Sequence, residues 1–243
     1  MDILKTLQEE LQIGYKQVEA AVQLIDEGNT IPFIARYRKE ATGSLNDEVL
    51  RNLDERLRYL RNLEEKKNQV LSSIRDQEKL TPELEKQIQD AMTMVALEDL
   101  YRPYRPKRRT RATIAKEKGL EPLANLLSLQ QLDHSAEEEA EAYISEEKGV
   151  ASAEEALQGA MDIVAEAIAD EADYRTYIRE KTMKKGTLTS TAKDEKAESV
   201  YEMYYNFEEP VAKLAGHRIL ALNRGEKEKI LTVKLEAPEE EII

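Results

Sequence analysis

Cysteine and tryptophan are both absent from this sequence of 243 residues, and phenylalanine occurs only twice. Without cysteine the chain has no disulfides, no thiolate nucleophile and no cysteine-ligated metal. Its only histidines are His134 and His217, so we expect neither a catalytic triad nor a zinc site. The sequence therefore predicts a protein that is not an enzyme and that holds no metal or cofactor.

Glycine and proline are also scarce, with nine and seven residues, which predicts few long loops. With only 5% aromatic residues and much Leu, Ala, Glu, Lys and Arg, the composition favours helix over strand. No uncharged apolar run approaches the ~18 residues that a membrane-spanning helix needs. The segment Met1–Lys5 lacks the basic and apolar regions of a signal peptide. We therefore expect a cytoplasmic protein without a membrane partner.

Charge is plentiful, at 35% of residues, but it is unevenly distributed along the chain. The net charge of −13 argues against a generic nucleic-acid-binding protein. Between Asp133 and Asp173, however, 14 acidic residues face a single lysine, a local balance of −13. From Asp99 to Lys118, eight Lys and Arg residues face two acidic ones, a balance of +6. The chain is thus electrically polarised rather than uniformly acidic.

Apolar residues at helical spacing predict two short helices, the first of which ends at Gly14, and a third that starts near Pro32 and closes at Gly43. The first two of these helices form either a DNA-binding helix-turn-helix or a packed hairpin. Asn46 is expected to cap a long helix that continues to about Asp76, a rod of ~45 Å. Its leucine columns break too early for a coiled coil, so we interpret it as a spine for other helices.

The second half of the sequence predicts acidic helices that begin at Ser135 and Ser152, where the capping-box pattern occurs. The segment 187–191 is β-prone but short, and a further helix is expected to end at Gly225. The alternation over 230–235 is the one good strand signal. We expect the partners of this strand to lie in a downstream domain outside the chain.

The predicted fold class is all-α: a multi-helix array with a helix-turn-helix-like N-terminus, one long spine helix and a minor β element near the C-terminus. We expect four segments: a helix-turn-helix-like part, the long helix with a basic loop, an acidic helical region, and a helix and strand that lead into a downstream domain. Their boundaries are 1–45, 46–128, 129–210 and 211–243.

Three unusual stretches carry a family resemblance: Ile31–Gly43 (IPFIARYRKEATG), Leu97–Leu120 and Gly216–Glu226 (GHRILALNRGE). Together they resemble the N-terminal region of the bacterial transcription accessory protein family Tex. The resemblance implies a longer protein that binds nucleic acid, with an inactive resolvase-type ribonuclease-H-like domain, helix-hairpin-helix modules and an S1 RNA-binding domain downstream. It also implies similarity to the core of a eukaryotic elongation factor that handles histones, and helix-turn-helix character between Leu4 and Lys39.

The strongest candidate site is the basic loop, whose prolines predict a stiff, extended segment rather than a helix. Its cations can each neutralise a phosphate, and its tyrosines offer stacking faces. These residues are Tyr101, Arg102, Tyr104, Arg105, Lys107, Arg108, Arg109 and Arg111. Alternatively, the loop forms salt bridges with the acidic helices between Asp133 and Asp173, and the tyrosines are packing residues.

Arg36, Arg38 and Lys39 are secondary candidates for phosphate or groove contact. The alternative that we favour for them is a short amphipathic helix with its apolar side on the core and Arg36 in a structural ion pair. The predicted function is sequence-independent nucleic-acid binding, RNA or DNA, by a non-catalytic transcription accessory module. The alternative is a scaffold that docks RNA polymerase or the downstream domains of the full-length protein without touching nucleic acid.

Overall fold

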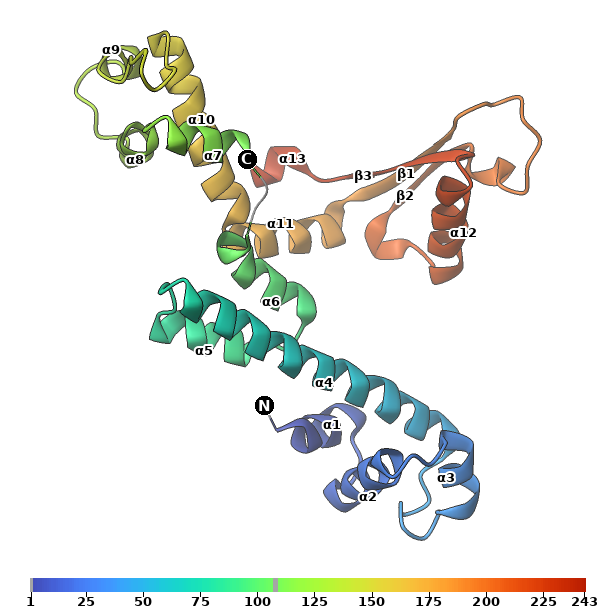
Figure 1. Ribbon diagram of the computed structural model, residues 1–243. Coiled ribbons are helices and arrows are strands. Elements are labelled where there is room, and N and C mark those ends of the chain that lie inside the picture. Colours follow the sequence, from blue (N-terminus) through green and yellow to red (C-terminus); the bar gives the residue numbers. More distant parts are fainter. Residues whose placement is uncertain (1, 107–108) are drawn as a thin grey trace. The chain divides into compact units, whose positions relative to one another are not determined.

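The computed structural model describes residues 2–106 and 109–243 (Figure 1). The chain divides into two compact units, Met1–Arg105 and Pro106–Ile243. Within the described ranges the structure has thirteen α-helices and one three-stranded sheet. This confirms the prediction of a mostly helical fold with a minor β element, while the finer division into four segments stays a prediction.

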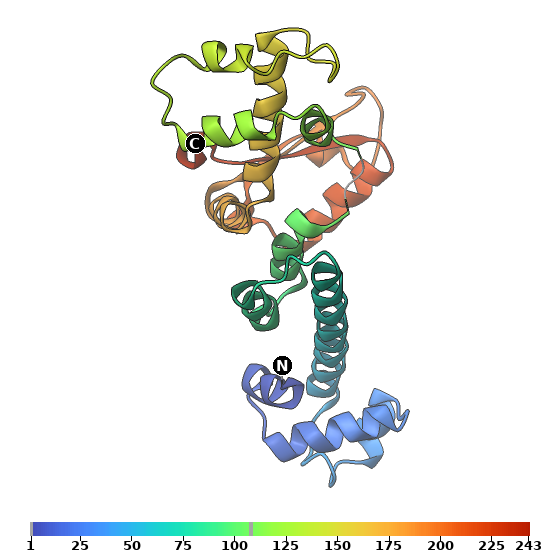
Figure 2. The ribbon, with the colours of Figure 1, turned by 60° about the vertical axis from the view of Figure 1, so that its left-hand side comes forward.

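The first unit is built along one helix of 30 residues, α4, which Figure 2 shows as a long rod. The side chain of Asn46 accepts a hydrogen bond from the Val49 amide at 2.9 Å, so the predicted cap is confirmed. The elements of this unit are α1 (Ile3–Leu11), α2 (Tyr15–Asp26), α3 (Ile31–Tyr37), α4 (Asp47–Asp76), α5 (Pro82–Asp90), α6 (Met94–Tyr101) and the 3₁₀ turn η1 (Arg102–Tyr104).

Two hydrophobic cores follow one another along α4. The first half of the α4 stripe, including Leu50 and Leu57, packs with Leu7, Val18 and Ile34 from α1, α2 and α3. The second half, from Leu63 to Ile74, packs with Ile88 of α5 and Leu97 of α6. The predicted spine is therefore confirmed, because each short helix buries its apolar face against α4 rather than against solvent.

Two predicted helix ends were wrong. The left-handed residue that ends α1 is Gln12 at φ 54°, whereas Gly14 has φ −68° and caps the start of α2. Likewise α3 ends at Tyr37 and not at Gly43, because Thr42 in the following turn is completely buried and its hydroxyl donates to the Arg38 carbonyl at 3.2 Å.

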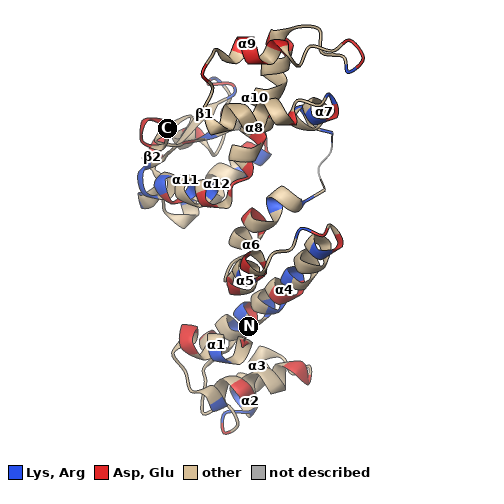
Figure 3. Cartoon of the chain, turned by 90° about the vertical axis from the view of Figure 1, so that its left-hand side faces the viewer, with Lys and Arg blue, Asp and Glu red and all other residues tan. Residues whose placement is uncertain are grey.

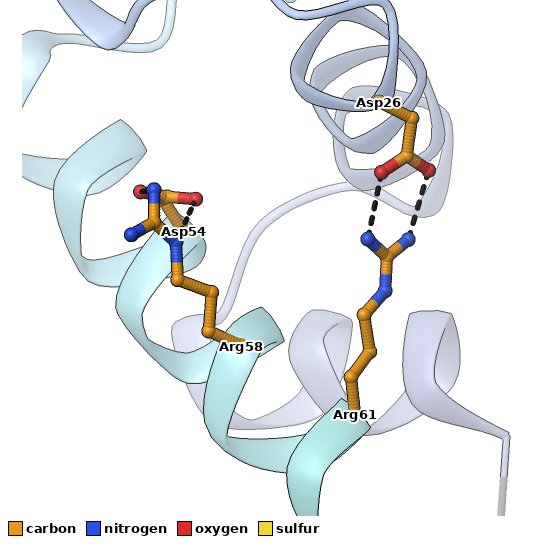
Figure 4. A network of polar contacts seen from close by, with 4 residues as sticks. All are labelled: Asp26, Asp54, Arg58 and Arg61. Atoms are coloured by element: carbon orange, nitrogen blue, oxygen red, sulfur yellow. Dashed lines mark hydrogen bonds and ion pairs between the residues drawn. The ribbon is translucent and has the colours of Figure 1, made fainter.

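Bidentate ion pairs attach α1 and α2 to α4. Arg56 donates to both carboxylate oxygens of Glu10, at 2.6 and 2.7 Å. Arg61 does the same with Asp26, at 2.7 and 2.8 Å, as the paired dashed lines in Figure 4 show. In each pair the hydrogen bonds from the arginine hold the pKa of the carboxyl below its usual value.

The second unit begins with a bundle of four helices and ends with the sheet (Figure 1). Its bundle packs mainly small residues, among them Ala115, Ala156 and Ala160. The side chains of Ser135 and Ser152 cap α9 and α10 as predicted. The elements are α7 (Arg111–Glu117), α8 (Glu121–Leu129), α9 (Ala136–Glu141), α10 (Ala153–Asp170), α11 (Ala172–Lys185), β1 (Thr187–Ala192), η2 (Glu202–Tyr204), β2 (Asn206–Pro210), η3 (Val211–Lys213), α12 (Gly216–Lys227), β3 (Leu231–Glu236) and α13 (Glu239–Ile242).

The sheet has the order β2-β1-β3, with both pairs antiparallel. In its register Thr189 lies opposite Lys234 on one side and Glu208 on the other. The expectation that β3 finds its partners in a downstream domain was therefore wrong. Its partner is β1, the short β-prone segment, which lies far upstream in sequence and becomes the central strand because the intervening α12 lets the chain return beside it.

The predicted end of a helix at Gly225 was also wrong, because α12 continues to Lys227. Gly225 is buried, and a Cβ atom there would lie 2.6 Å from Leu231 Cδ1 and 2.9 Å from Leu231 Cγ. The glycine therefore permits close packing of α12 on β3 and on Tyr201. In contrast, a Cβ atom at Gly216, in the first turn of the same helix, would meet nothing within 4 Å.

We expect Gly225→Ala to lower the free energy of unfolding by about 1–3 kcal/mol, as overpacking does in tight cores. Gly216→Ala is the matched control on the same helix and should change stability by less than about 0.5 kcal/mol. Thermal and urea unfolding measure both variants. Equal stability of the two would contradict the proposed packing role of Gly225.

A second prediction concerns pH. The pKa of Glu10 is lowered in the folded state from its usual value of 4.5. The pair with Arg56 therefore stabilises the fold at pH values above 4.5, and this stabilisation is lost as the pH falls through the folded-state pKa. Glu10→Gln should therefore cost about 1 kcal/mol or less near neutral pH and nothing in acid. Urea unfolding over a pH series measures this, with Glu9→Gln as control, since Glu9 is exposed and lies 4.0 Å from Lys5.

Candidate nucleic-acid interface

The basic loop spans the boundary between the two units. Its first part, through Arg105, belongs to the first unit, and Arg109 and Arg111 belong to the second. Lys107 and Arg108 lie outside the described residues. The segment is also not wholly extended as predicted, because Arg102–Tyr104 forms the 3₁₀ turn η1 directly after α6.

Tyr101 and Tyr104 face the protein interior. The Tyr101 hydroxyl lies 3.0 Å from Ser73 Oγ of α4, and Gln77 Nε2 donates to the Tyr104 carbonyl at 2.9 Å. Both rings are half-buried against the core formed by α4, α5 and α6. This geometry favours packing over base stacking for the two tyrosines, in line with the alternative role raised by the sequence.

The described arginines of the loop point into solvent but have carboxylates nearby. Arg109 donates to Glu117 at 2.8 Å. Looser contacts of 3.9 Å join Arg105 to Glu98 and Arg111 to Asp162. Their side chains remain 69%, 64% and 84% exposed, respectively. Exposed pairs of this kind contribute about 0–1 kcal/mol, so a polyanion can replace the carboxylates at little cost.

Salt bridges between the basic segment, residues 99–118, and the acidic segment, residues 133–173, are few in the described part of the chain. Asp162 of α10 contacts Arg111, and Glu155 of α10 accepts from Lys118 at 2.5 Å. The Lys118 hydrogen bond lowers the pKa of the Glu155 carboxyl. Most acidic residues of the acidic segment are exposed instead, among them Glu137, Glu138 and Glu141 of α9, whose acidic positions are red in Figure 3.

The secondary candidates Arg36, Arg38 and Lys39 come together at the end of α3. Ile34 on the opposite side is completely buried, so the amphipathic helix of the favoured alternative is present. The structural ion pair expected for Arg36 is not found within the described ranges. All three cations are exposed, and two of them lie beside the rings of Phe33 and Tyr37.

Sequence reasoning missed these two aromatic residues. Their spacing of four residues places both on one face of α3, with ring centroids 5.2 Å apart. That spacing, next to three cations, was the signal in the sequence that would have found them.

Features of other functional classes are sparse in the described part of the chain. No group of three or more His, Asp and Glu side chains has the geometry to hold a metal ion there. The ring of His134 contacts Glu139 at 2.8 Å. None of the described helices combines the length and the apolar character needed to cross a membrane.

Fold and surface together define a mostly helical module of two compact units, with the exposed arginine Arg105 in the first and Arg109 and Arg111 in the second. Comparison with known protein families shows which family this module belongs to. A family model described as the Tex-like protein N-terminal domain matches residues 1–75, and one described as Tex central region-like matches residues 131–242. The chain therefore belongs to the Tex family.

Individual relatives agree with this assignment. Over 96% of its length the chain is 49% identical to protein YdcI of Bacillus subtilis (strain 168), and over 97% it is 44% identical to the transcriptional accessory protein Tex of Neisseria gonorrhoeae. A human protein named S1 RNA-binding domain-containing protein 1 is 30% identical over 96% of the chain. The chain spans 33%, 31% and 24% of the lengths of these three relatives, respectively.

The position of Tyr101 generates a prediction. Tyr101→Phe removes the hydroxyl contact with Ser73 and should lower the free energy of unfolding by about 1 kcal/mol. Ser73→Ala should cost a similar amount, and the double variant should cost less than the sum of the two. Urea unfolding of the four proteins measures this coupling. Strict additivity would show that the contact contributes nothing.

Proposed function

We propose that the chain is a non-catalytic transcription accessory module of cytoplasmic proteins that binds RNA or DNA without sequence preference through its basic segment. One observation carries the proposal: Arg105, Arg109 and Arg111 remain 64–84% exposed although carboxylates lie close to them. The names of two relatives, a transcriptional accessory protein and an S1 RNA-binding domain-containing protein, support a role connected with nucleic acid.

Binding would rest on phosphate contacts. Each arginine that moves from a protein carboxylate to a phosphate releases counterions from the nucleic acid, so affinity falls steeply with salt. Such contacts carry no sequence information. The bidentate geometry of guanidinium on phosphate is stronger than the single contacts that Arg105 and Arg111 make at 3.9 Å.

The alternative function is a protein-interaction scaffold that docks RNA polymerase or the downstream domains of the full-length protein. It is favoured by the fact that each of these three arginines already has an acidic neighbour, Glu98, Glu117 or Asp162. Under this alternative the basic segment contributes only to protein contacts, and the chain has no measurable affinity for nucleic acid.

Substituting four cations of the segment by alanine distinguishes the two functions. The variant Arg105→Ala, Lys107→Ala, Arg108→Ala, Arg109→Ala should lose most of its affinity for single-stranded RNA and duplex DNA. Loss of four phosphate contacts should also make the slope of log K against log salt shallower by about 3. Fluorescence anisotropy with labelled oligonucleotides at rising salt measures both quantities.

A control variant with the same change of net charge is available elsewhere in the second unit: Lys193→Ala, Lys196→Ala, Lys227→Ala, Lys234→Ala, all exposed positions. It should bind almost as well as the parent chain. Equal weakening of both variants would contradict a defined site, because net charge alone would then control binding. If the parent chain binds the oligonucleotides with a dissociation constant above about 10⁻⁴ M, the result supports the scaffold function instead.

A further inference from the structure

The end of α3 carries an unusual surface of rings and cations on the first unit. The guanidinium carbon of Arg38 lies 5.1 Å from the centre of the Phe33 ring, and that of Arg36 lies 6.0 Å from the centre of the Tyr37 ring. The two rings lie 5.2 Å apart at 45°. We call Phe33, Arg36, Tyr37, Arg38 and Lys39 the α3 surface. Its residue Tyr37 is 60% exposed, which is high for an aromatic residue.

The cations of the α3 surface lack acidic partners in the part of the chain that the structure describes. Within the described residues, Arg36, Arg38 and Lys39 have no carboxylate at ion-pair distance, although the chain has 49 acidic residues against 36 Lys and Arg. Elsewhere in the same unit, exposed arginines such as Arg51, Arg58 and Arg61 each pair with a carboxylate at 2.5–2.7 Å. A local excess of unpaired positive charge in an acidic protein is suited to an external anion.

The backbone that carries the α3 surface is firmly held. Thr42, completely buried, donates to the Arg38 carbonyl at 3.2 Å. Gln17 of α2 donates to the carbonyls of Thr42 and Gly43 at 3.2 and 3.0 Å. These contacts fix the turn after α3 to α2. The backbone that carries the cations is therefore preorganised, which lowers the entropy cost of binding.

An open depression adjoins the α3 surface. Arg36 and Lys39 line it together with one carboxylate, that of Asp47, and with smaller or uncharged residues such as Pro32 and Ala35. Because the Asp47 carboxylate already pairs with Arg51 at 2.5 Å, the two cations of the depression can serve a sugar-phosphate unit. Neighbouring phosphates and bases of one strand can then reach Arg38 and the Tyr37 ring.

We propose that the α3 surface binds single-stranded nucleic acid, with an unpaired base stacked on Tyr37 and phosphates on Arg36, Arg38 and Lys39. Stacking on an exposed ring beside cations is the usual basis of single-strand binding, and it tolerates any base. An acidic peptide would use the cations but leave the ring uncovered, and a duplex does not offer a base face. The α3 surface shares no residue with the basic segment, so this inference can be tested independently of the proposed function.

The absence of tryptophan from the chain allows a direct test. In Tyr37→Trp the new indole is the only tryptophan, and stacking of a base on it should quench its fluorescence. We expect saturable, salt-sensitive quenching by oligo(U) and oligo(dT) of about 12 nucleotides, and little quenching by a duplex of the same length. Tyr174→Trp, at a position in the second unit with 53% exposure, is the matched control and should show none.

Anisotropy titrations with the same oligonucleotides give an independent measurement. Tyr37→Ala should weaken single-strand binding about 5-fold or more, and Tyr37→Phe should retain it, because the ring and not the hydroxyl stacks. The same losses should appear when Tyr37→Ala is introduced into the variant with four substitutions in the basic segment. Unchanged binding by the variant with four substitutions, together with quenching in Tyr37→Trp, would refute only the basic-segment function.

Three results would overturn the inference about the α3 surface. One is unchanged indole fluorescence at saturating oligonucleotide. Another is quenching by duplex as strong as by single strands. The third is a fluorescence response to poly-glutamate that equals or exceeds that to oligo(U), which would assign the surface to an acidic protein partner.

Discussion

Burial of one leucine stripe on α4 is the constraint on which the first unit depends. The short helices around it are too brief to be stable alone in water, because isolated helices need roughly 12–15 residues or more. Their order comes from packing on Leu50, Leu57, Leu60 and Leu63, all of which are 0–1% exposed. Even the position of Lys67 follows from this constraint. It is buried in line with the stripe, and its ammonium group donates to the Gln89 carbonyl at 2.7 Å and pairs with Glu64 at 3.1 Å.

Electrostatic pairing separates structural cations from available ones. Arg56 and Arg61 lie on the helix that organises the unit, and their bidentate pairs hold α1 and α2 in place. The cations of the basic segment have looser or more exposed partners, and those of the α3 surface have none within the described ranges. In a protein with net charge −13, these two groups of cations are exposed and belong to a chain of the Tex family.

Local signals were enough to predict much of the fold. The long helix, its cap at Asn46, the serine caps of α9 and α10 and the strand over residues 231–236 all follow from periodicity and side-chain chemistry within a few residues. The position of the two tyrosines of the basic segment was not decided by such signals. A tyrosine beside arginines in sequence has the same neighbours whether its ring stacks on a base or packs on a core. Only the packing of both rings on the core of α4, α5 and α6, and the contact of the Tyr101 hydroxyl with Ser73, separate the two.

By itself, the sequence determined the helical class, the separation of charge and the family, because each of these is a property of composition, spacing or a continuous string of residues. Only the tertiary structure decided that β3 pairs with β1, that Gly225 serves close packing rather than a helix end, and that Arg36 has no ion pair with a described residue. The physical reason is the same in each case. These outcomes depend on which distant side chains meet in space, and no pattern within one turn or one strand contains that information.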